Sequence, residues 1–192
     1  MTSSTLTKGF SLIELLVVVA IIGILIVITL PAISSVMQST DLTRGGQVVA
    51  DHVNLARQIA SAQNSVVELR FIKLPDRAGY SAIQLWKADT NGGMKPARAL
   101  STLPQSVTVA PNPPLPGFMS SLPSGTMPVG SASAPYAAIQ IRPTGQVTPV
   151  LSMSNMFLAI VPTAMATNSQ LPPNYFLLQI NPLTGVQLIY RP

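Results

Sequence analysis

The chain has 192 residues, with 11 Lys and Arg, 6 Asp and Glu, one His and no Cys. This length fits one domain of modest core size plus an extension. The lack of cysteine excludes a disulfide framework, and it excludes a lipoprotein signal because such a signal requires a cysteine to acylate. The formal charge of +5 is spread along the chain rather than clustered, so the charge alone does not indicate a nucleic-acid partner.

The N-terminal part of the chain is predicted to form a transmembrane helix over residues 10–36. Residues 15–40 contain no charged side chain, and residues 15–30 are nearly all Leu, Val and Ile. At helical rise such a stretch can cross a hydrocarbon core of roughly 30 Å. Glu14 lies at the start of this segment, where an ionisable side chain costs on the order of 2.5 kcal/mol or more. Glu14 therefore needs a partner or a function.

The sequence K-G-F-S-L-I-E-L at residues 8–15 resembles the processing site of type IV prepilins and type II secretion pseudopilins. The resemblance implies a leader that ends at Gly9, cleavage by a prepilin peptidase and N-methylation of Phe10, and a role in assembly for Glu14. The residue types suit this processing. Gly9 leaves the cleaved bond sterically open, and Lys8 holds the leader on the cytoplasmic side of the membrane.

An ordinary signal peptide and an uncleaved signal anchor are the alternatives for this segment. A signal peptide has a short basic region, an apolar core and a small-residue cleavage site, and Leu-Pro-Ala at residues 30–32 could serve as that site. The core of a signal peptide has no reason to hold Glu14, however, and the uncharged run is longer than the usual core. The signal anchor stays open.

Pro31 is predicted to kink the helix, because proline removes one backbone hydrogen bond. Related pilins carry a proline at the matching place. The resemblance therefore implies that the helix can unwind locally at Pro31 when subunits enter the filament. An ordinary bend at the membrane surface is the alternative.

Residues 37–65 are predicted to continue the helix as an amphipathic segment. Glycine costs about 1 kcal/mol relative to alanine within a helix, so Gly45 and Gly46 weaken it and a hinge is expected near Gly45. Apolar or small residues recur at spacings of four and three along one stripe, at Leu42, Gly46, Val49, Val53, Ala56 and Ala60.

Residues 66–192 are predicted to form a mainly antiparallel β domain. Apolar and polar residues alternate over residues 67–72, which is the pattern of a half-buried strand. Residues 139–147 and 178–186 resemble each other, and each reads as a hairpin whose turn holds Pro and Gly. Eight prolines over residues 104–135 predict a long surface loop. Further strands are expected at 80–88, 106–109, 137–142, 156–161, 175–180 and 186–190.

The expected fold is α+β, with a long N-terminal transmembrane and amphipathic helix packed on a mainly antiparallel β-sheet domain. This arrangement is similar to minor pseudopilins of the GspH and FimT type, and residues 55–69 resemble their transition from helix to first strand. The absence of cysteine argues against a major type IV pilin, many of which carry a C-terminal disulfide loop. A narrower resemblance is to the D component of the Verru_Chthon cassette of prepilin-like proteins, through L-A-R-Q at 55–58, L-P-D at 74–76, Q-L-W-K at 84–87 and N-P-L-T-G at 181–185.

The resemblance implies four parts: a leader of residues 1–9, a filament-core helix of residues 10–36, its amphipathic continuation over residues 37–65, and a periplasmic domain of residues 66–192. The chain would cross the inner membrane once, with its leader in the cytoplasm, and would then enter a periplasmic or surface filament. The implied partners are the prepilin peptidase, other pilin or pseudopilin subunits and the lipid of the inner membrane.

The sequence shows no catalytic or metal-binding constellation. The one histidine, His52, lies beside Asp51 in the predicted helix, where neighbours point in different directions. A positioned catalytic base is therefore not expected there. No acidic residue follows Asp89, and a calcium site needs several clustered oxygen ligands. We expect neither a metal nor a cofactor, and we expect that the chain is not an enzyme.

The main functional hypothesis is a structural subunit of a type II secretion pseudopilus or of a type IV pilus-like filament. A DNA-binding minor pilin is the alternative, suggested by the basic balance and by the role of some FimT-like relatives in DNA uptake. A phosphate-binding surface concentrates Lys and Arg, whereas here Arg70, Lys73 and Arg77 form the only close group. Nucleic acid is therefore not an expected partner. A signal-anchored periplasmic domain with another activity is the third possibility.

Overall fold

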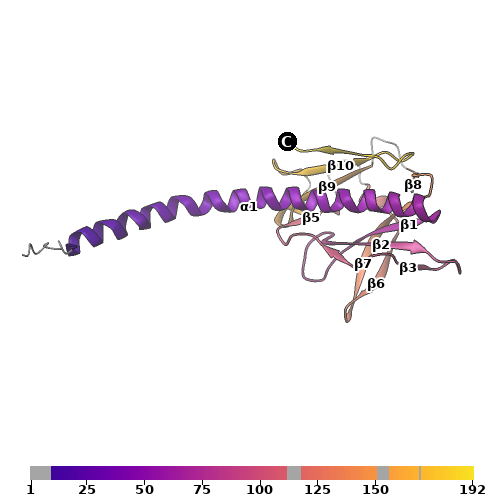
Figure 1. Ribbon diagram of the computed structural model, residues 1–192, viewed down its shortest axis with the longest axis horizontal. Helices are drawn as coiled ribbons and strands as arrows, with labels where there is room; N and C mark the ends of the chain where they lie inside the picture. The colour runs from indigo at the N-terminus through magenta and orange to yellow at the C-terminus, as the bar shows by residue number, and fades with distance from the viewer. Residues whose placement is uncertain (1–9, 112–117, 151–155, 169) are drawn as a thin grey trace, which may run out of the picture. The chain divides into compact units, whose positions relative to one another are not determined.

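A computed structural model describes residues 10–111, 118–150, 156–168 and 170–192 of the chain. The chain divides into two compact units, Met1–Met37 and Gln38–Pro192. Helix α1 begins in the first unit and ends in the second, which also holds two antiparallel sheets (Figure 1). The predicted α+β class with a mainly antiparallel β domain is confirmed.

Helix α1 (Leu12–Gln63) runs over 52 residues. Its backbone is described throughout, but the side chains of residues 28–35 are not. These residues belong to the predicted membrane segment, and they include Pro31, where a kink is predicted. Within the described part of the chain, none of the helices offers an apolar stretch of the length that a membrane crossing needs.

The larger sheet has the strand order β3-β2-β1-β7-β6, with β4 paired to β2 and β8 paired to β7. Its strands are β1 (Val67–Ile72), β2 (Ala82–Ala88), β3 (Met94–Pro96), β4 (Ser101–Thr102), β6 (Ser124–Val129), β7 (Ala132–Ile141) and β8 (Val147–Thr148). Because β1 pairs with both β2 and β7, it is the central strand of this sheet.

The smaller sheet has the order β11-β10-β9-β5. It is formed by β5 (Val107–Val109), β9 (Phe157–Pro162), β10 (Phe176–Ile180) and β11 (Gln187–Tyr190). Two short 3-10 helices, η1 (Met119–Ser121) and η3 (Thr163–Met165), lie in the connections. Every described strand pairing in both sheets is antiparallel.

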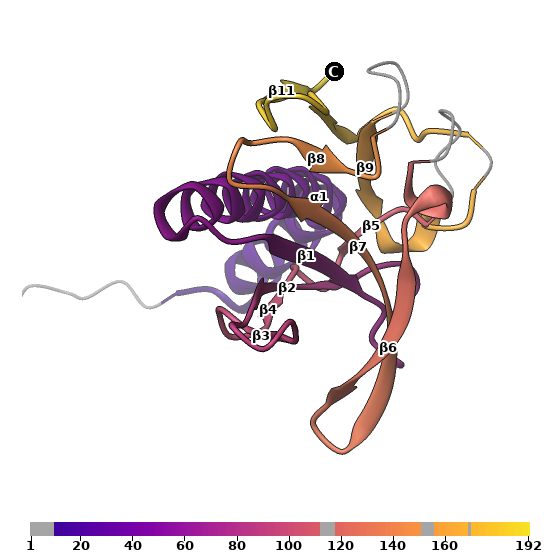
Figure 2. The ribbon, with the colours of Figure 1, turned by 90° about the vertical axis from the view of Figure 1, so that its right-hand side faces the viewer.

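The main core of the domain is built from α1 and both sheets. Figure 2 shows the domain part of the helix lying between the two sheets. Val53 of α1, Phe71 and Ile139 of the larger sheet, and Leu158 of the smaller sheet are all fully buried in this cluster. Each such side chain contributes about 1.5–3 kcal/mol when it leaves water. The core therefore holds the helix and the sheets together as one domain.

The domain part of α1 buries the predicted stripe. Gly45 and Gly46 belong to the same buried face, and α1 continues through both of them instead of forming the expected hinge. A Cβ atom on Gly45 would lie 2.7 Å from Cγ2 of Val107, and one on Gly46 would lie less than 3.0 Å from ring atoms of Phe176. The two glycines thus let the helix approach β5 and β10 closely. All the predicted stripe positions are buried: Leu42, Gly46, Val49, Val53, Ala56 and Ala60.

Helix α1 ends in a Schellman motif, which redirects the chain into β1. Asn64 has a φ of 45°, a left-handed conformation that asparagine tolerates better than most residues. The amide of Ser65 donates to the carbonyl of Ala60 at 3.2 Å, and the amide of Asn64 donates to the carbonyl of Ser61 at 3.5 Å.

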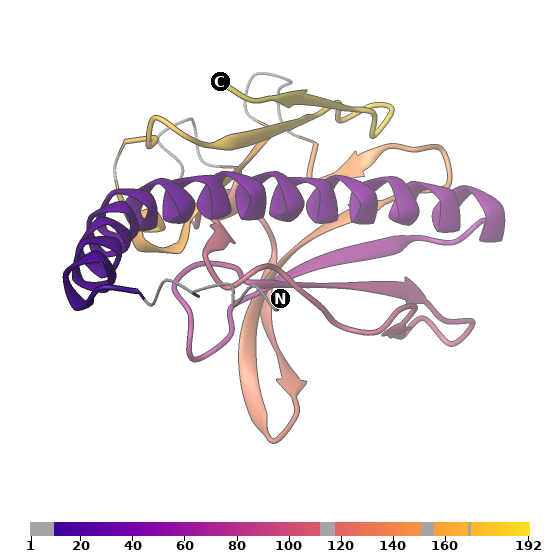
Figure 3. The ribbon, with the colours of Figure 1, turned by 60° about the vertical axis from the view of Figure 1, so that its left-hand side comes forward.

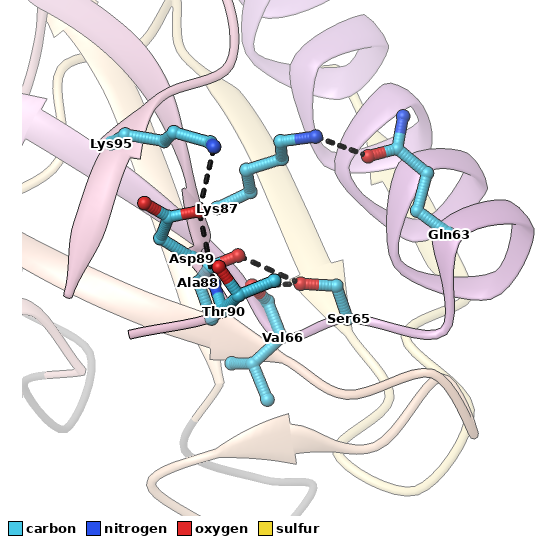
Figure 4. A network of polar contacts seen from close by, with 8 residues as sticks. All are labelled: Gln63, Ser65, Val66, Lys87, Ala88, Asp89, Thr90 and Lys95. Atoms are coloured by element: carbon cyan, nitrogen blue, oxygen red, sulfur yellow. Dashed lines mark hydrogen bonds and ion pairs between the residues drawn. The ribbon is translucent and has the colours of Figure 1, made fainter. Parts of the chain in front are cut away.

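Hydrogen bonds between this turn and the β2–β3 hairpin tie the turn in place (Figure 4). Lys87 Nζ donates to Gln63 Oε1 at 2.8 Å, and Ser65 Oγ donates to the carbonyl of Ala88 at 3.3 Å. Lys95 Nζ lies 2.7 Å from Asp89 Oδ1, and this hydrogen bond lowers the pKa of Asp89. The Lys95–Asp89 pair is exposed, so water screens it and it adds little to stability.

Each strand predicted from the sequence is found, with ends that differ by a few residues. The prediction of a long surface loop over residues 104–135 is wrong, because β5, β6 and the start of β7 lie within that stretch. Residues 112–117 of it lie outside the described residues. Strand β6 is at the edge of its sheet, where Pro128 can pair with Ser133 although it has no N–H to offer on the outer side. Figure 3 shows the β6–β7 hairpin extending away from the helix.

The last strand, β11, returns to α1. Gln187 Nε2 donates to the carbonyl of Ala50 at 2.8 Å. Just after the strand, Arg191 donates to the carbonyl of Ser39 at 3.1 Å and to its Oγ at 2.9 Å. The end of the chain is thus bonded to the residues with which the domain begins.

Candidate functional site

The predicted processing site adjoins the first described residues. Lys8 and Gly9 lie outside the described part of the chain, whereas Phe10 is described and is 76% exposed. Glu14 lies in the first turn of α1, and its amide donates to the carbonyl of Ser11 at 3.1 Å. The acid predicted to act in assembly therefore sits about one helical turn from Phe10.

The start of α1 also has the signature of a capped helix. Ser11 directly precedes the helix and Glu14 is its third residue, which is the spacing of a capping box. Phe10 and Leu15 occupy the two positions of a hydrophobic staple. The helix dipole favours a carboxylate in this first turn. The role predicted for Glu14 is in assembly alone, although the Ser-x-x-Glu spacing also indicates a capping box.

The apolar side chains that are described over residues 12–27 of the first unit are exposed on all sides of the helix. Those described between residues 12 and 27 range from 45% exposed at Val18 to 81% exposed at Leu12. A helix that is apolar on every side normally lies in an apolar environment.

The predicted basic group is used inside the domain, and Arg70 is its most buried member. Arg70 Nε donates to Glu68 Oε1 at 2.5 Å, and both residues are 8% exposed. The guanidinium carbon lies 3.9 Å from the centre of the Trp86 ring and 4.3 Å from that of Tyr136. Gln140 Nε2 donates to the second carboxylate oxygen at 3.2 Å. Arg70 is thus enclosed by an acid and two aromatic rings.

The other two members of the group also face the protein. Lys73 Nζ lies 4.9 Å from the centre of the Tyr80 ring. Arg77 donates to the carbonyl of Leu103 at 2.9 Å and to that of Val107 at 2.8 Å, and burial lowers its pKa. The bonds of Arg77 hold β5 and the segment before it against the connection between β1 and β2. The group does not form an open phosphate-binding surface, and the DNA-binding alternative is not favoured.

His52 bonds to its own helix. Its Nδ1 lies 2.7 Å from the carbonyl of Val48, one turn earlier in α1. Among the residues that the structure describes, no three His, Cys, Asp or Glu side chains come together as ligands of a metal ion.

Residues 6–30 match the family described as the prokaryotic N-terminal methylation motif. The match includes Gly9, Phe10 and Glu14, and it continues through the apolar segment that follows. The predicted prepilin-type N-terminal segment is therefore confirmed. No curated protein matches the chain, and the narrower likeness to the Verru_Chthon cassette stays a prediction.

Among solved structures, two of the minor pseudopilin EpsH from the type 2 secretion system of Vibrio cholerae are similar to this chain. Their TM-scores are 0.48 and 0.49, each at 13% identity, and they cover 79% and 80% of this chain and 98% and 96% of their own. The type IV minor pilin FimU of Pseudomonas aeruginosa has a TM-score of 0.47 at 11% identity, covering 80% of this chain and 93% of its own. At these identities the likeness concerns the fold alone.

Proposed function

We propose that the chain is a minor pseudopilin or pilin subunit of a type II secretion or type IV pilus-like filament. It is cut after Gly9, N-methylated at Phe10 and assembled through its apolar helix. The observation that carries this proposal is the methylation motif of residues 6–30, which overlaps the first part of α1, where the described apolar side chains of residues 12–27 are exposed. The separate core of Gln38–Pro192 would stay outside the assembled helices.

Glu14 supplies the charge that assembly of apolar helices needs. After cleavage, Phe10 carries a positive amino group, and the Glu14 carboxylate of a neighbouring subunit pairs with it. Burying either charge alone is costly, and pairing offsets that cost. In the free subunit the same carboxylate stabilises its own helix, because it lies near the positive end of the helix dipole. Assembly would thus exchange a local role of Glu14 for a contact between subunits.

Before assembly the subunit would sit in the inner membrane as a single-pass protein. Lys8 would keep the leader on the cytoplasmic side, and the β domain would face the periplasm. Lipid would cover the apolar side chains until other subunits replace it, and Pro31 would allow local unwinding on entry into the filament. The prepilin peptidase and the other subunits are the proposed partners, and no catalytic activity is proposed.

The mass of the mature N-terminal peptide tests the processing step. In cells with the native processing machinery, the peptide is expected to begin at Phe10 and to carry one added methyl group. A chain that begins at Met1 or Thr2 would instead indicate an uncleaved anchor. A chain cut near Ala32 would indicate an ordinary signal peptide, and either result would contradict the filament proposal.

Replacing Glu14 by valine tests the assembly step. We expect cleavage after Gly9 to continue, and incorporation into filaments to fall about tenfold or more, because the amino group of Phe10 would be buried without its partner. The measurement is the amount of variant recovered in isolated filaments, compared with its amount in the membrane.

Two further variants separate the charge of Glu14 from its helix-capping role. Glu14→Gln keeps a side chain that can complete a capping box but removes the charge, so it should fail like Glu14→Val. Glu14→Asp keeps the charge and should assemble better than either. Normal incorporation of the valine or glutamine variant would show that Glu14 does not act through its charge.

A further inference from the structure

The two hairpin turns that resemble each other in sequence meet in the structure. Gly145, between β7 and β8, has a φ of 88°, and Gly185, between β10 and β11, has a φ of 64°. A Cβ on Gly145 would lie 2.8 Å from the carbonyl oxygen of Thr184, and one on Gly185 would lie 2.8 Å from that of Gly145. Only glycine allows both the conformation and the contact. The turns therefore pack backbone against backbone.

A cavity of about 660 Å³ lies between these turns and α1. None of the described residues that line it is acidic. The stem of Arg57 packs on one of the turns, since a Cβ on Gly185 would lie 2.9 Å from its Cδ. Helix, turn and glycine together hold Arg57 in place. The polar side chains that line the cavity are Asn54, Arg57, Gln58, Ser61, Thr144 and Thr184.

Arg57 can only donate hydrogen bonds, whereas the amide and hydroxyl side chains that line the cavity can both donate and accept. Arg57 has no hydrogen bond or ion pair with any residue in the described part of the chain. The Oγ1 of Thr184 accepts from the amide of Val186 at 3.3 Å, and that of Thr144 accepts from the amide of Gln146 at 3.5 Å. Each hydroxyl therefore keeps its own hydrogen to donate. Donors without an acidic acceptor fit a ligand that only accepts.

We propose that this cavity binds a carboxylate group. An ionised carboxylate only accepts hydrogen bonds, and its two oxygens match the planar fork of the Arg57 guanidinium. One guanidinium balances the single charge of a carboxylate, whereas a phosphate monoester carries about −1.5 to −2 at neutral pH. The carboxylate belongs to a small organic acid or to an acidic side chain of another protein.

The lysines of a second cavity are weaker candidates for binding a carboxylate, because they already have partners within the chain. In the cavity beside the β2–β3 hairpin, Lys95 already pairs with Asp89, and Lys87 donates to Gln63. Arg57 differs because its cavity, as far as its lining is described, contains no acidic side chain. The assignment rests on residues of Gln38–Pro192 and is independent of processing at Gly9.

Binding to the full-length chain in detergent solution tests the proposal. Calorimetric titrations at constant ionic strength would use acetate, inorganic phosphate and a peptide of alternating Glu and Gly. We expect at least one carboxylate probe to bind, and phosphate to bind about tenfold more weakly than that probe. Tighter binding of the peptide than of acetate assigns the carboxylate to a protein, and tighter or equal binding of acetate assigns it to a free acid. Equal binding of phosphate, or no binding of either carboxylate probe, would overturn the proposal.

Variants of Arg57 connect the binding to this cavity. Arg57→Gln is expected to weaken carboxylate binding about tenfold or more, since a hydrogen-bonded charged pair is lost. Arg57→Lys should also bind more weakly, because an ammonium group lacks the fork. Arg98→Gln removes the same charge at an exposed position outside the cavity and should bind normally. Thermal unfolding checks that each variant is folded, and unchanged affinity in a folded Arg57→Gln variant would overturn the site.

Discussion

Replacing Gly46 by valine is expected to lower the free energy of unfolding by about 2–3 kcal/mol. Gly46 lies on the buried face of α1, where an added Cβ would come within 3.0 Å of ring atoms of Phe176. The side chain of Phe176 is only 1% exposed, so its ring cannot move aside without disturbing the packed core. Denaturant unfolding followed by circular dichroism measures the change.

Gly23→Val is the matched control for this prediction, because nothing described lies within 4 Å of a Cβ built on Gly23 of the same helix. Its unfolding transition should stay within error of that of the original chain. Gly46→Ala should lie between the two, since its methyl group still meets the ring while alanine gains about 1 kcal/mol in helix propensity. An unchanged transition for Gly46→Val would refute the close approach of α1 to β10.

Replacing Glu68 by glutamine is expected to cost about 3 kcal/mol of unfolding free energy, because it leaves the Arg70 guanidinium buried without its anion. Both residues are 8% exposed, and the rings of Trp86 and Tyr136 enclose the guanidinium. Water therefore cannot replace the lost carboxylate. Urea unfolding gives the value, and the fluorescence of Trp86 reports the same transition from beside the pair.

Two controls separate burial from charge in this prediction. Asp89→Asn breaks the exposed pair with Lys95 and should leave the unfolding midpoint unchanged, because water screens that pair. Changing Glu68 to Leu together with Arg70 to Met should recover most of the lost stability, since apolar residues can fill a buried ion-pair site. Equal effects of Glu68→Gln and Asp89→Asn would show that the Glu68–Arg70 pair is open to solvent.

The features that follow from local periodicity were predictable. The stripe from Leu42 to Ala60 is buried as its spacing indicates, because helical geometry alone decides which residues share a face. The two Pro- and Gly-containing hairpins are also found, as β7–β8 and β10–β11. Turn residues act within a few positions of the chain, so sequence suffices to identify them.

The features that depend on contacts between distant segments were not predictable. Alternation over β1 indicated a half-buried strand, yet all six of its residues are buried, because Trp86 and Tyr136 cover the outer face of the sheet. Gly45 and Gly46 suggested a hinge, since nothing local shows that Val107 and Phe176 approach them. The contact between the two similar turns likewise arises only when the two sheets come together.

The bonds between Arg191 and Ser39 join positions 152 residues apart in sequence, and this sets when the domain can finish folding. Closing so long a loop is entropically costly, and chains dominated by distant contacts fold slowly. Strand β11 cannot take its place until residues 187–191 have been synthesised. The apolar part of α1 is synthesised well before them. Any chaperone that assists this chain would therefore have to act on an unfinished β domain.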